Sequence, residues 1–140
     1  MKLYVGFGSN LGDRRKAIHE AVAAMAETVG PMTALSSLYE TEPVEMTSEH
    51  KFLNAVACYE TELSPSQLLF ASQEIEKAMG RTEKSHDGQH FDRIIDIDLL
   101  MLDDVKIDAE VLPGQWLTLP HPRMKDRDIV MKPLKEIINT

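Results

Sequence analysis

Two aspartates, Asp96 and Asp98, stand two residues apart in an apolar run that ends at Leu102. Residues 93–102 alternate as a β-strand does, so both carboxylates project from one face, roughly 7 Å apart. Two carboxylates on one face repel each other and are expensive to bury. Because the strand is apolar enough to be expected in the centre of a sheet, this face needs either solvent or a cation beside the acids.

The residues alone are compatible with either a cation or solvent beside the two aspartates. Mg²⁺ usually takes one or two carboxylates and completes its shell with water and substrate phosphates, so Asp96 and Asp98 suit it. The alternative is an exposed face on which the two acids are ordinary solvated residues.

Basic residues bracket the aspartate pair along the chain. Phosphoryl transfer needs metal ions and Arg or Lys side chains that hold the migrating charge, with little covalent help from the protein. The pattern therefore favours phosphoryl chemistry, although each base taken singly is more typical of a solvated surface. The bracketing residues are Arg81, Lys84, Arg93, His121, Arg123, Lys125 and Arg127.

Two segments have helical periodicity, with apolar residues at three- and four-residue steps. The first helix is expected over residues 14–28, capped by Asn10 or Asp13. The second starts at Ser64, because Pro65 and Gln67 complete a capping box, and it ends at Gly80. The predicted inner faces are Ile18, Val22, Met25 and Val29, and Leu68, Ser72, Ile75 and Met79.

Short apolar stretches between turn residues predict the strands. They are expected at residues 3–7, 33–39, 52–60, 93–102 and 105–107, with one or two short helices after Met124. Gly6 and Gly8 are expected to break the first strand, and the third is apolar enough to be central. Polar residues 81–91 predict a mobile loop. The order predicts one α+β domain over residues 1–140, with a ferredoxin-like βαββαβ core and a mainly antiparallel sheet.

Composition excludes several classes of protein. The net charge of −8 argues against a nucleic-acid binder, and no apolar stretch is long enough to span a membrane. The lone Cys58 excludes a disulfide framework and is expected to be a small core residue. With no signal-peptide pattern at the start of the sequence and no heptad repeat, we expect a cytoplasmic monomer.

The chain resembles the 6-hydroxymethyl-7,8-dihydropterin pyrophosphokinases of folate biosynthesis. The resemblance runs from Leu3 to about Ile137, and its most specific part is the segment from Asp92 to Leu100 around the two aspartates. The other matching segments are residues 8–13, 36–43, 52–55, 73–76, 80–81, 119–124, 127 and 133–134.

This resemblance implies an activity and a set of site residues. The family moves the β,γ-diphosphate of ATP to the hydroxymethyl oxygen of the pterin and releases AMP. By resemblance, Asp96 and Asp98 bind two Mg²⁺ ions, and Arg81 and Arg93 are catalytic. The residues that match positions around ATP are Gln73, Glu76, Lys84, His121 and Arg127. The residues that match the pterin pocket are Gly8, Thr41, Val44, Phe52, Asn54 and Ile129.

The sequence departs from the family pattern at a few positions. Glu83 and His90 stand where many relatives have arginine and tryptophan, and Asp92 replaces a common proline. Ile129 stands where many have a second aromatic ring against the pterin. A rival hypothesis is a non-catalytic ferredoxin-like module that binds a ligand or partner protein, which would leave the aspartate pair without a purpose. A third hypothesis is a relative of the family that has kept pterin binding but lost the transfer.

Overall fold

The structure is a computed structural model and describes residues 1–41, 51–80 and 94–138. The predicted loop at 81–91 lies outside these residues, as does most of the loop after residue 40. The elements are β1 (Lys2–Ser9), α1 (Arg14–Val29), β2 (Met32–Leu35), β3 (Tyr39–Thr41), β4 (Phe52–Glu60), α2 (Pro65–Ala78), β5 (Asp96–Leu102), β6 (Ile107–Leu112), β7 (Gln115–Leu119), the 3₁₀ helix η1 (Met124–Asp126) and α3 (Asp128–Ile137). They confirm the α+β class.

The main sheet is antiparallel, with strands in the order β2-β4-β1-β5 and with β3 paired to β4. If β2 and β3 together count as the second strand, this order is consistent with the ferredoxin-like arrangement. The prediction that β4 is central is confirmed. The prediction that β5 is central is wrong, because among the described strands of this sheet β5 pairs only with β1.

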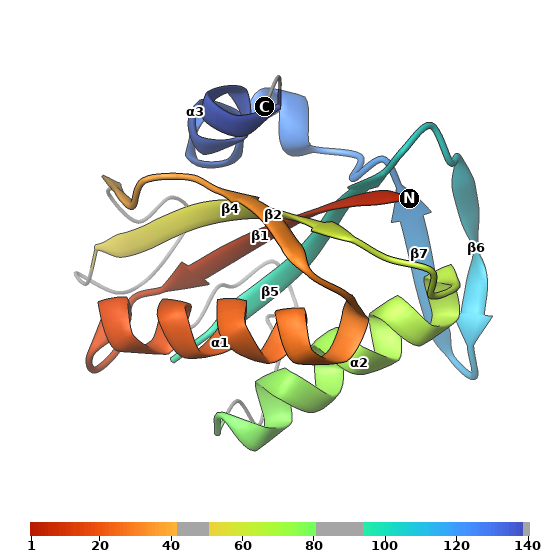
Figure 1. The fold of residues 1–140 in the computed structure, drawn as a ribbon, viewed down its shortest axis with the longest axis horizontal. Helices are drawn as coiled ribbons and strands as arrows, with labels where there is room; N and C mark the ends of the chain where they lie inside the picture. Colours follow the sequence, from red (N-terminus) through yellow and green to blue (C-terminus); the bar gives the residue numbers. More distant parts are fainter. Residues whose placement is uncertain (42–50, 81–93, 139–140) are drawn as a thin grey trace.

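Helices lie on both faces of the sheet (Figure 1). Helices α1 and α2 cover one face, and α3 lies over the other. The larger core lies under α1 and α2, where buried Val5, Phe7, Ile97 and Leu99 meet the inner faces of the helices. A smaller core beneath α3 contains Cys58, which is buried as expected.

Local capping sets where the helices begin. The Asp13 carboxylate accepts a hydrogen bond from the Lys16 N–H at 3.1 Å at the start of α1. Ser64 and Gln67 form the predicted capping box at the start of α2. The predicted inner faces are buried at every position except Met79, which is half-buried.

Several predicted strand limits were wrong. The glycines do not break β1, because Gly6 and Gly8 both pair with β4 and with β5. The strand β5 begins at Asp96 rather than at residue 93, since its pairing with β1 begins at Asp96. The strand predicted near 105–107 begins only at Ile107, and it forms a hairpin with the unpredicted β7.

The predicted strand at 33–39 is divided into β2 and β3. Between them Ser36 is buried, and its backbone N–H donates to the Val56 carbonyl at 2.9 Å. The Ser36 hydroxyl in turn accepts from the Val56 N–H at 2.9 Å. A side chain thus replaces the backbone acceptor that a continuous ladder would supply.

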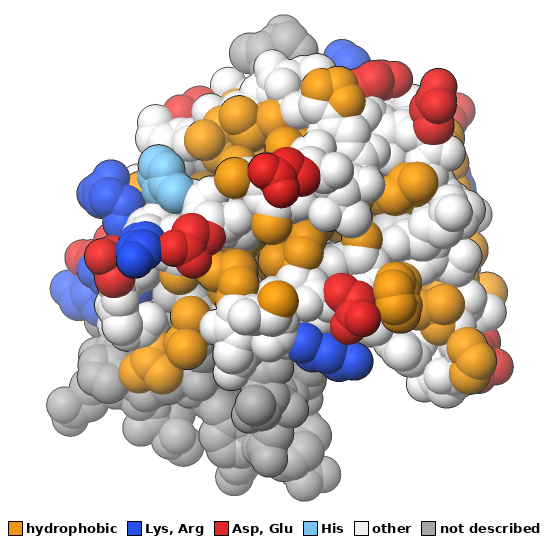
Figure 2. Space-filling view, turned by 60° about the horizontal axis from the view of Figure 1, so that its bottom comes forward, with side chains coloured by type: hydrophobic (Ala, Val, Ile, Leu, Met, Phe, Trp, Pro, Cys, Tyr) orange, Lys and Arg blue, Asp and Glu red, His pale blue; other side chains and the backbone are white. Residues whose placement is uncertain are grey.

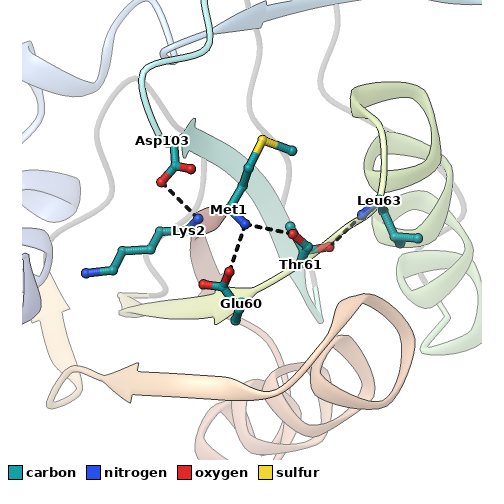
Figure 3. A network of polar contacts seen from close by, with 6 residues as sticks. All are labelled: Met1, Lys2, Glu60, Thr61, Leu63 and Asp103. Carbon is teal, nitrogen blue, oxygen red and sulfur yellow. Dashed lines mark hydrogen bonds and ion pairs between the residues drawn. The ribbon is translucent and has the colours of Figure 1, made fainter.

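Polar contacts join three segments at the start of β1 (Figure 3). The Met1 ammonium donates to the Glu60 carboxylate at 2.8 Å and to the Thr61 carbonyl at 2.9 Å. The Lys2 N–H donates to Asp103 Oδ1 at 3.0 Å, in the turn after β5. These bonds tie β1 to the end of β4 and to the end of β5.

The side of the molecule that carries α1 and α2 has a mixed surface. Hydrophobic side chains form patches between acidic, basic and uncharged ones in this view (Figure 2). A groove here has Leu63, Phe70 and Leu112 among its lining residues, and Phe70 is 55% exposed. No helix among the described residues is both long and apolar enough to cross a membrane.

Candidate functional site

Strand register places predicted pterin residues and predicted metal ligands in one row across the sheet. Gly8 on β1 lies opposite Asn54 of β4 on one side and opposite Asp96 of β5 on the other. Residues directly opposite each other on neighbouring strands project to the same face. Asn54 and Asp96 therefore share a face, two strand spacings or roughly 10 Å apart, with only a glycine between them.

A second row runs beside the first. Gly6 lies opposite Val56 and Asp98, so it separates β4 from the second carboxylate as Gly8 separates it from the first. The position of Gly6 beside Asp98 was not predicted from the sequence. Its signal was the two-residue spacing of Gly6 and Gly8, which matches the spacing of Asp96 and Asp98 on the next strand.

Gly8 leaves room that a side chain would fill. A Cβ at this position would lie 3.0 Å from Asn54 Oδ1 and 3.5 Å from the Phe52 ring. Gly8, Phe52 and Asn54 thus lie next to one another. Asn54 is buried and Phe52 is half-buried, so an amide and a ring line this space.

Two further predicted pterin residues lie on neighbouring elements. Thr41 on β3 pairs with Phe52. Ile129 is half-buried in the first turn of α3, the helix that packs against β4. The structure does not describe Val44.

Asp96 and Asp98 are half-buried at the start of β5. Within residues 1–41, 51–80 and 94–138, no group of three or more His, Cys, Asp or Glu side chains could enclose a metal ion. A pair of carboxylates suits Mg²⁺, which keeps several waters and takes its other ligands from substrate phosphates. The donor chemistry fits Mg²⁺ bound together with a nucleotide.

His121 lies near Asp96. Its backbone N–H donates to the Leu100 carbonyl of β5 at 2.8 Å, and its Nδ1 accepts from the Arg123 N–H at 3.3 Å. Burial lowers the pKa of His121, the Arg127 and Arg123 cations lower it further, and the Asp96 carboxylate opposes this shift. His121 and Arg127, both predicted at the nucleotide, therefore interact electrostatically and lie on the Asp96 side of the sheet.

The two α2 residues predicted at the nucleotide contact different strands. The Gln73 amide donates to the side chain of Gln115, the first residue of β7. Glu76 is buried, and its Oε2 accepts a hydrogen bond from the Ile97 N–H at 2.8 Å. Arg81, Lys84 and Arg93 lie outside the described residues.

The apolar groove along α2 is separate from these residues. Helix α2 packs on the face of the sheet that Ile97 and Leu99 bury, whereas Asp96 and Asp98 project to the other face. The groove therefore contributes nothing to the row of Asn54, Gly8 and Asp96.

The chain is similar to known proteins over almost its whole length. The family model described as 7,8-dihydro-6-hydroxymethylpterin-pyrophosphokinase (HPPK) matches residues 4–139. A 2-amino-4-hydroxy-6-hydroxymethyldihydropteridine pyrophosphokinase of Porphyromonas gingivalis is 42% identical over 138 residues, which is 96% of this chain and 89% of that protein. A protein of the same name from Bacillus subtilis is 38% identical over 135 residues, covering 96% of this chain and 76% of the relative.

Solved structures show the same fold at low identity. The HPPK-DHPS of Plasmodium falciparum, in its wild-type form with pteroate, superimposes with a TM-score of 0.73 at 16% identity. The match covers 96% of this chain and 38% of that chain, so the present chain corresponds to a minor part of the longer protein. The family model, which matches nearly the whole chain, and the bacterial relatives, which are matched over most of their length, place the chain in the 6-hydroxymethyl-7,8-dihydropterin pyrophosphokinase family.

Proposed function

We propose that this protein transfers the β,γ-diphosphate of ATP to the hydroxymethyl oxygen of 6-hydroxymethyl-7,8-dihydropterin, giving AMP and the pterin diphosphate in tetrahydrofolate biosynthesis. One observation carries the proposal beyond family membership. The register places Asn54, Gly8 and Asp96 side by side on one face of the sheet. A pterin against Asn54 and a nucleotide beside Asp96 would meet there.

The pterin end is supported by the chemistry of its residues. The Asn54 amide can both donate to and accept from the heterocycle's edge. The Phe52 ring offers a face for stacking, and Gly8 leaves space between them. We assign Thr41, Val44 and Ile129 to the rest of this pocket from the family resemblance.

The phosphate end is centred on the carboxylates of Asp96 and Asp98, which would hold two Mg²⁺ ions with ATP. Bound Mg²⁺ would neutralise phosphate charge and help to orient the transferred group. His121, Arg127 and Gln73 border the nucleotide in this proposal, and Lys84 joins them from the resemblance. Arg81 and Arg93 are assigned to stabilise charge on the transferring group.

The decisive experiment is to incubate the protein with ATP, Mg²⁺ and 6-hydroxymethyl-7,8-dihydropterin and to separate the nucleotides. AMP should accumulate in step with pterin diphosphate, and only when all three components are present. ADP as the product would contradict the proposal. Tight pterin binding without turnover would instead favour a relative that has kept pterin binding but lost the transfer.

We further propose that the protein is a cytoplasmic monomer without a nucleic-acid or membrane partner. The acidic balance of 23 Asp and Glu against 15 Lys and Arg supports the lack of a nucleic-acid partner. The single, buried Cys58 is in keeping with a reducing compartment. Light scattering across a range of protein concentrations tests the monomer.

A further inference from the structure

Glu76 is unusual among the charged residues of this protein. Within residues 1–41, 51–80 and 94–138 it is the only Asp, Glu, Lys or Arg that is buried, with 2% of its surface exposed. Burying a carboxylate is unfavourable unless strong hydrogen bonds satisfy it. Its position therefore requires a specific partner.

One such partner is the backbone of β5, between the two aspartates. Glu76 Oε2 accepts from the Ile97 N–H at 2.8 Å. Ile97 lies opposite Phe7 of β1, and β5 has no second strand partner within the described part of the sheet. Helix α2 thus supplies, through one side chain, an acceptor that a further strand would otherwise provide.

This bond acts on the geometry of the aspartate pair. The Ile97 N–H belongs to the peptide unit that joins Asp96 to Ile97, and Ile97 separates the two aspartates. Fixing that unit restrains the backbone dihedrals on which the directions of both carboxylates depend. The Ile97 side chain is itself buried, so the segment is held from its edge and from its inner face.

We propose that Glu76 is a positioning residue, which holds the Asp96–Ile97 peptide unit so that the two aspartates are arranged for Mg²⁺ before it binds. In this proposal Glu76 acts through the β5 backbone, in place of the nucleotide contact that the family resemblance implies. The inference rests on the proposed function, because it takes Asp96 and Asp98 as the Mg²⁺ ligands.

Two substitutions separate positioning from direct contact. Glu76→Gln keeps an oxygen that accepts from Ile97 but removes the charge, whereas Glu76→Met keeps the length and removes the acceptor. Ile75→Ala is the matched control, because Ile75 is a buried neighbour on α2 that lies beside the apolar groove. It weakens helix packing and leaves the Glu76–Ile97 bond in place.

The first measurement needs no ligand. Amide hydrogen exchange of Ile97 should be at least about tenfold faster in Glu76→Met than in the parent, and within about twofold of the parent in Glu76→Gln. Ile75→Ala should speed Ile97 exchange only as far as it lowers global stability. Unchanged exchange in Glu76→Met overturns the proposal.

The second measurement is the Mg²⁺ concentration for half-maximal AMP formation at saturating ATP and pterin. It should rise at least about fivefold in Glu76→Met and stay near the parent value in Glu76→Gln and Ile75→Ala. If Glu76→Gln raises it while Ile97 exchange is unchanged, Glu76 contacts the ligand directly and the proposal is wrong. Glu76→Gln therefore also tests the proposal if Glu76→Met does not fold.

A parallel Asp98→Asn variant distinguishes this inference from the function on which it rests. If Asp98→Asn keeps the parent's Mg²⁺ dependence, the assignment of the metal ligands has failed. If Asp98→Asn loses turnover while Glu76→Met keeps the parent's Mg²⁺ dependence, only the positioning role has failed.

Discussion

Glu136 and Ser37 lie 99 residues apart in the chain and are joined by three hydrogen bonds. The Ser37 N–H donates to both carboxylate oxygens, at 2.9 and 3.0 Å, and the Ser37 hydroxyl donates at 2.6 Å. The Tyr39 hydroxyl donates to the same carboxylate at 2.9 Å. Glu136 thus fastens α3 to the segment between β2 and β3.

These bonds predict a pH-dependent stability. The Ser37 bonds, and then the Tyr39 bond, hold the pKa of Glu136 below its ordinary value of 4.5. A carboxyl whose pKa falls on folding stabilises the protein above its unfolded pKa, and this contribution is lost as pH falls through the folded pKa. Glu136→Gln should therefore lower the Tm at pH 7, and the difference should close as the pH falls below 4.5. Thermal melts at several pH values would measure it, and a constant difference would contradict it.

Asp98→Asn should reduce AMP formation by roughly a hundredfold or more, because metal ions supply several kcal/mol of charge stabilisation in such reactions. The chain should still fold, since Asp98 is half-buried and asparagine has nearly the same shape. Asp104→Asn, in the exposed turn after β5, is the charge-matched control and should keep parent activity. Rates measured across Mg²⁺ concentrations test this, and parent-like rates in Asp98→Asn would exclude the assignment.

The two glycines of β1 should differ sharply in their tolerance of a methyl group. In Gly8→Ala the new Cβ would lie 3.0 Å from Asn54 Oδ1, tighter than ordinary contact, and would fill the space beside Phe52. In Gly6→Ala it would lie 3.5 Å from Leu100, an ordinary contact. We expect the KM for pterin to rise in Gly8→Ala and to change little in Gly6→Ala. Equal KM values in both variants would place the pterin elsewhere.

The pterin pocket should gain affinity from a second ring. An aromatic pair contributes roughly 0.5–1.5 kcal/mol beyond area burial, which is about two- to tenfold in affinity. Ile129→Phe should therefore tighten pterin binding by about that factor. Phe52→Ala should weaken binding by more, since it also removes apolar contact. Calorimetric titration in the presence of an unreactive ATP analogue measures both, and parent-like affinity in Phe52→Ala would show that Phe52 does not stack on the pterin.

Tyr59→Phe tests stability away from the site. The Tyr59 hydroxyl is buried and donates to the Val22 carbonyl of α1 at 2.8 Å, and burial raises the pKa of this phenol. Removing one such bond should lower the free energy of unfolding by about 1 kcal/mol. Urea denaturation measures the loss, and turnover should match the parent. A variant as stable as the parent would show that the bond contributes nothing net.

The sequence predicted the helices well because their signals are local. The capping residues Asp13 and Ser64 each act within three residues of their position, and the apolar spacing supplies the rest. The edge position of β5 was mispredicted because its outer side is not open to water. Glu76 bonds to it there, and β7 lies against it, so an edge strand carries the apolar residues typical of a central one.

The division of β2 from β3 depended on a non-local contact. Ser36 bonds to Val56 on another strand, and nothing in the neighbouring residues of either position indicates that pairing. The site was predicted in a similar, partial way. Alternation alone placed Asp96 and Asp98 on one face, whereas their alignment with Gly8 and Asn54 depends on strand register, which the sequence does not reveal without the family resemblance.

The two faces of β1 have different tasks. Gly8 leaves one face clear between Asn54 and Asp96, while Phe7 beside it fills the core on the other. A shift of β1 by one residue against β4 would exchange these faces, because side chains alternate. The Phe7 ring would then occupy the gap between Asn54 and Asp96, and a glycine would leave a hole in the core. A misaligned chain would therefore lose folding stability and substrate access together, so the strand pairing that makes the protein stable is also the one that keeps its reaction space open.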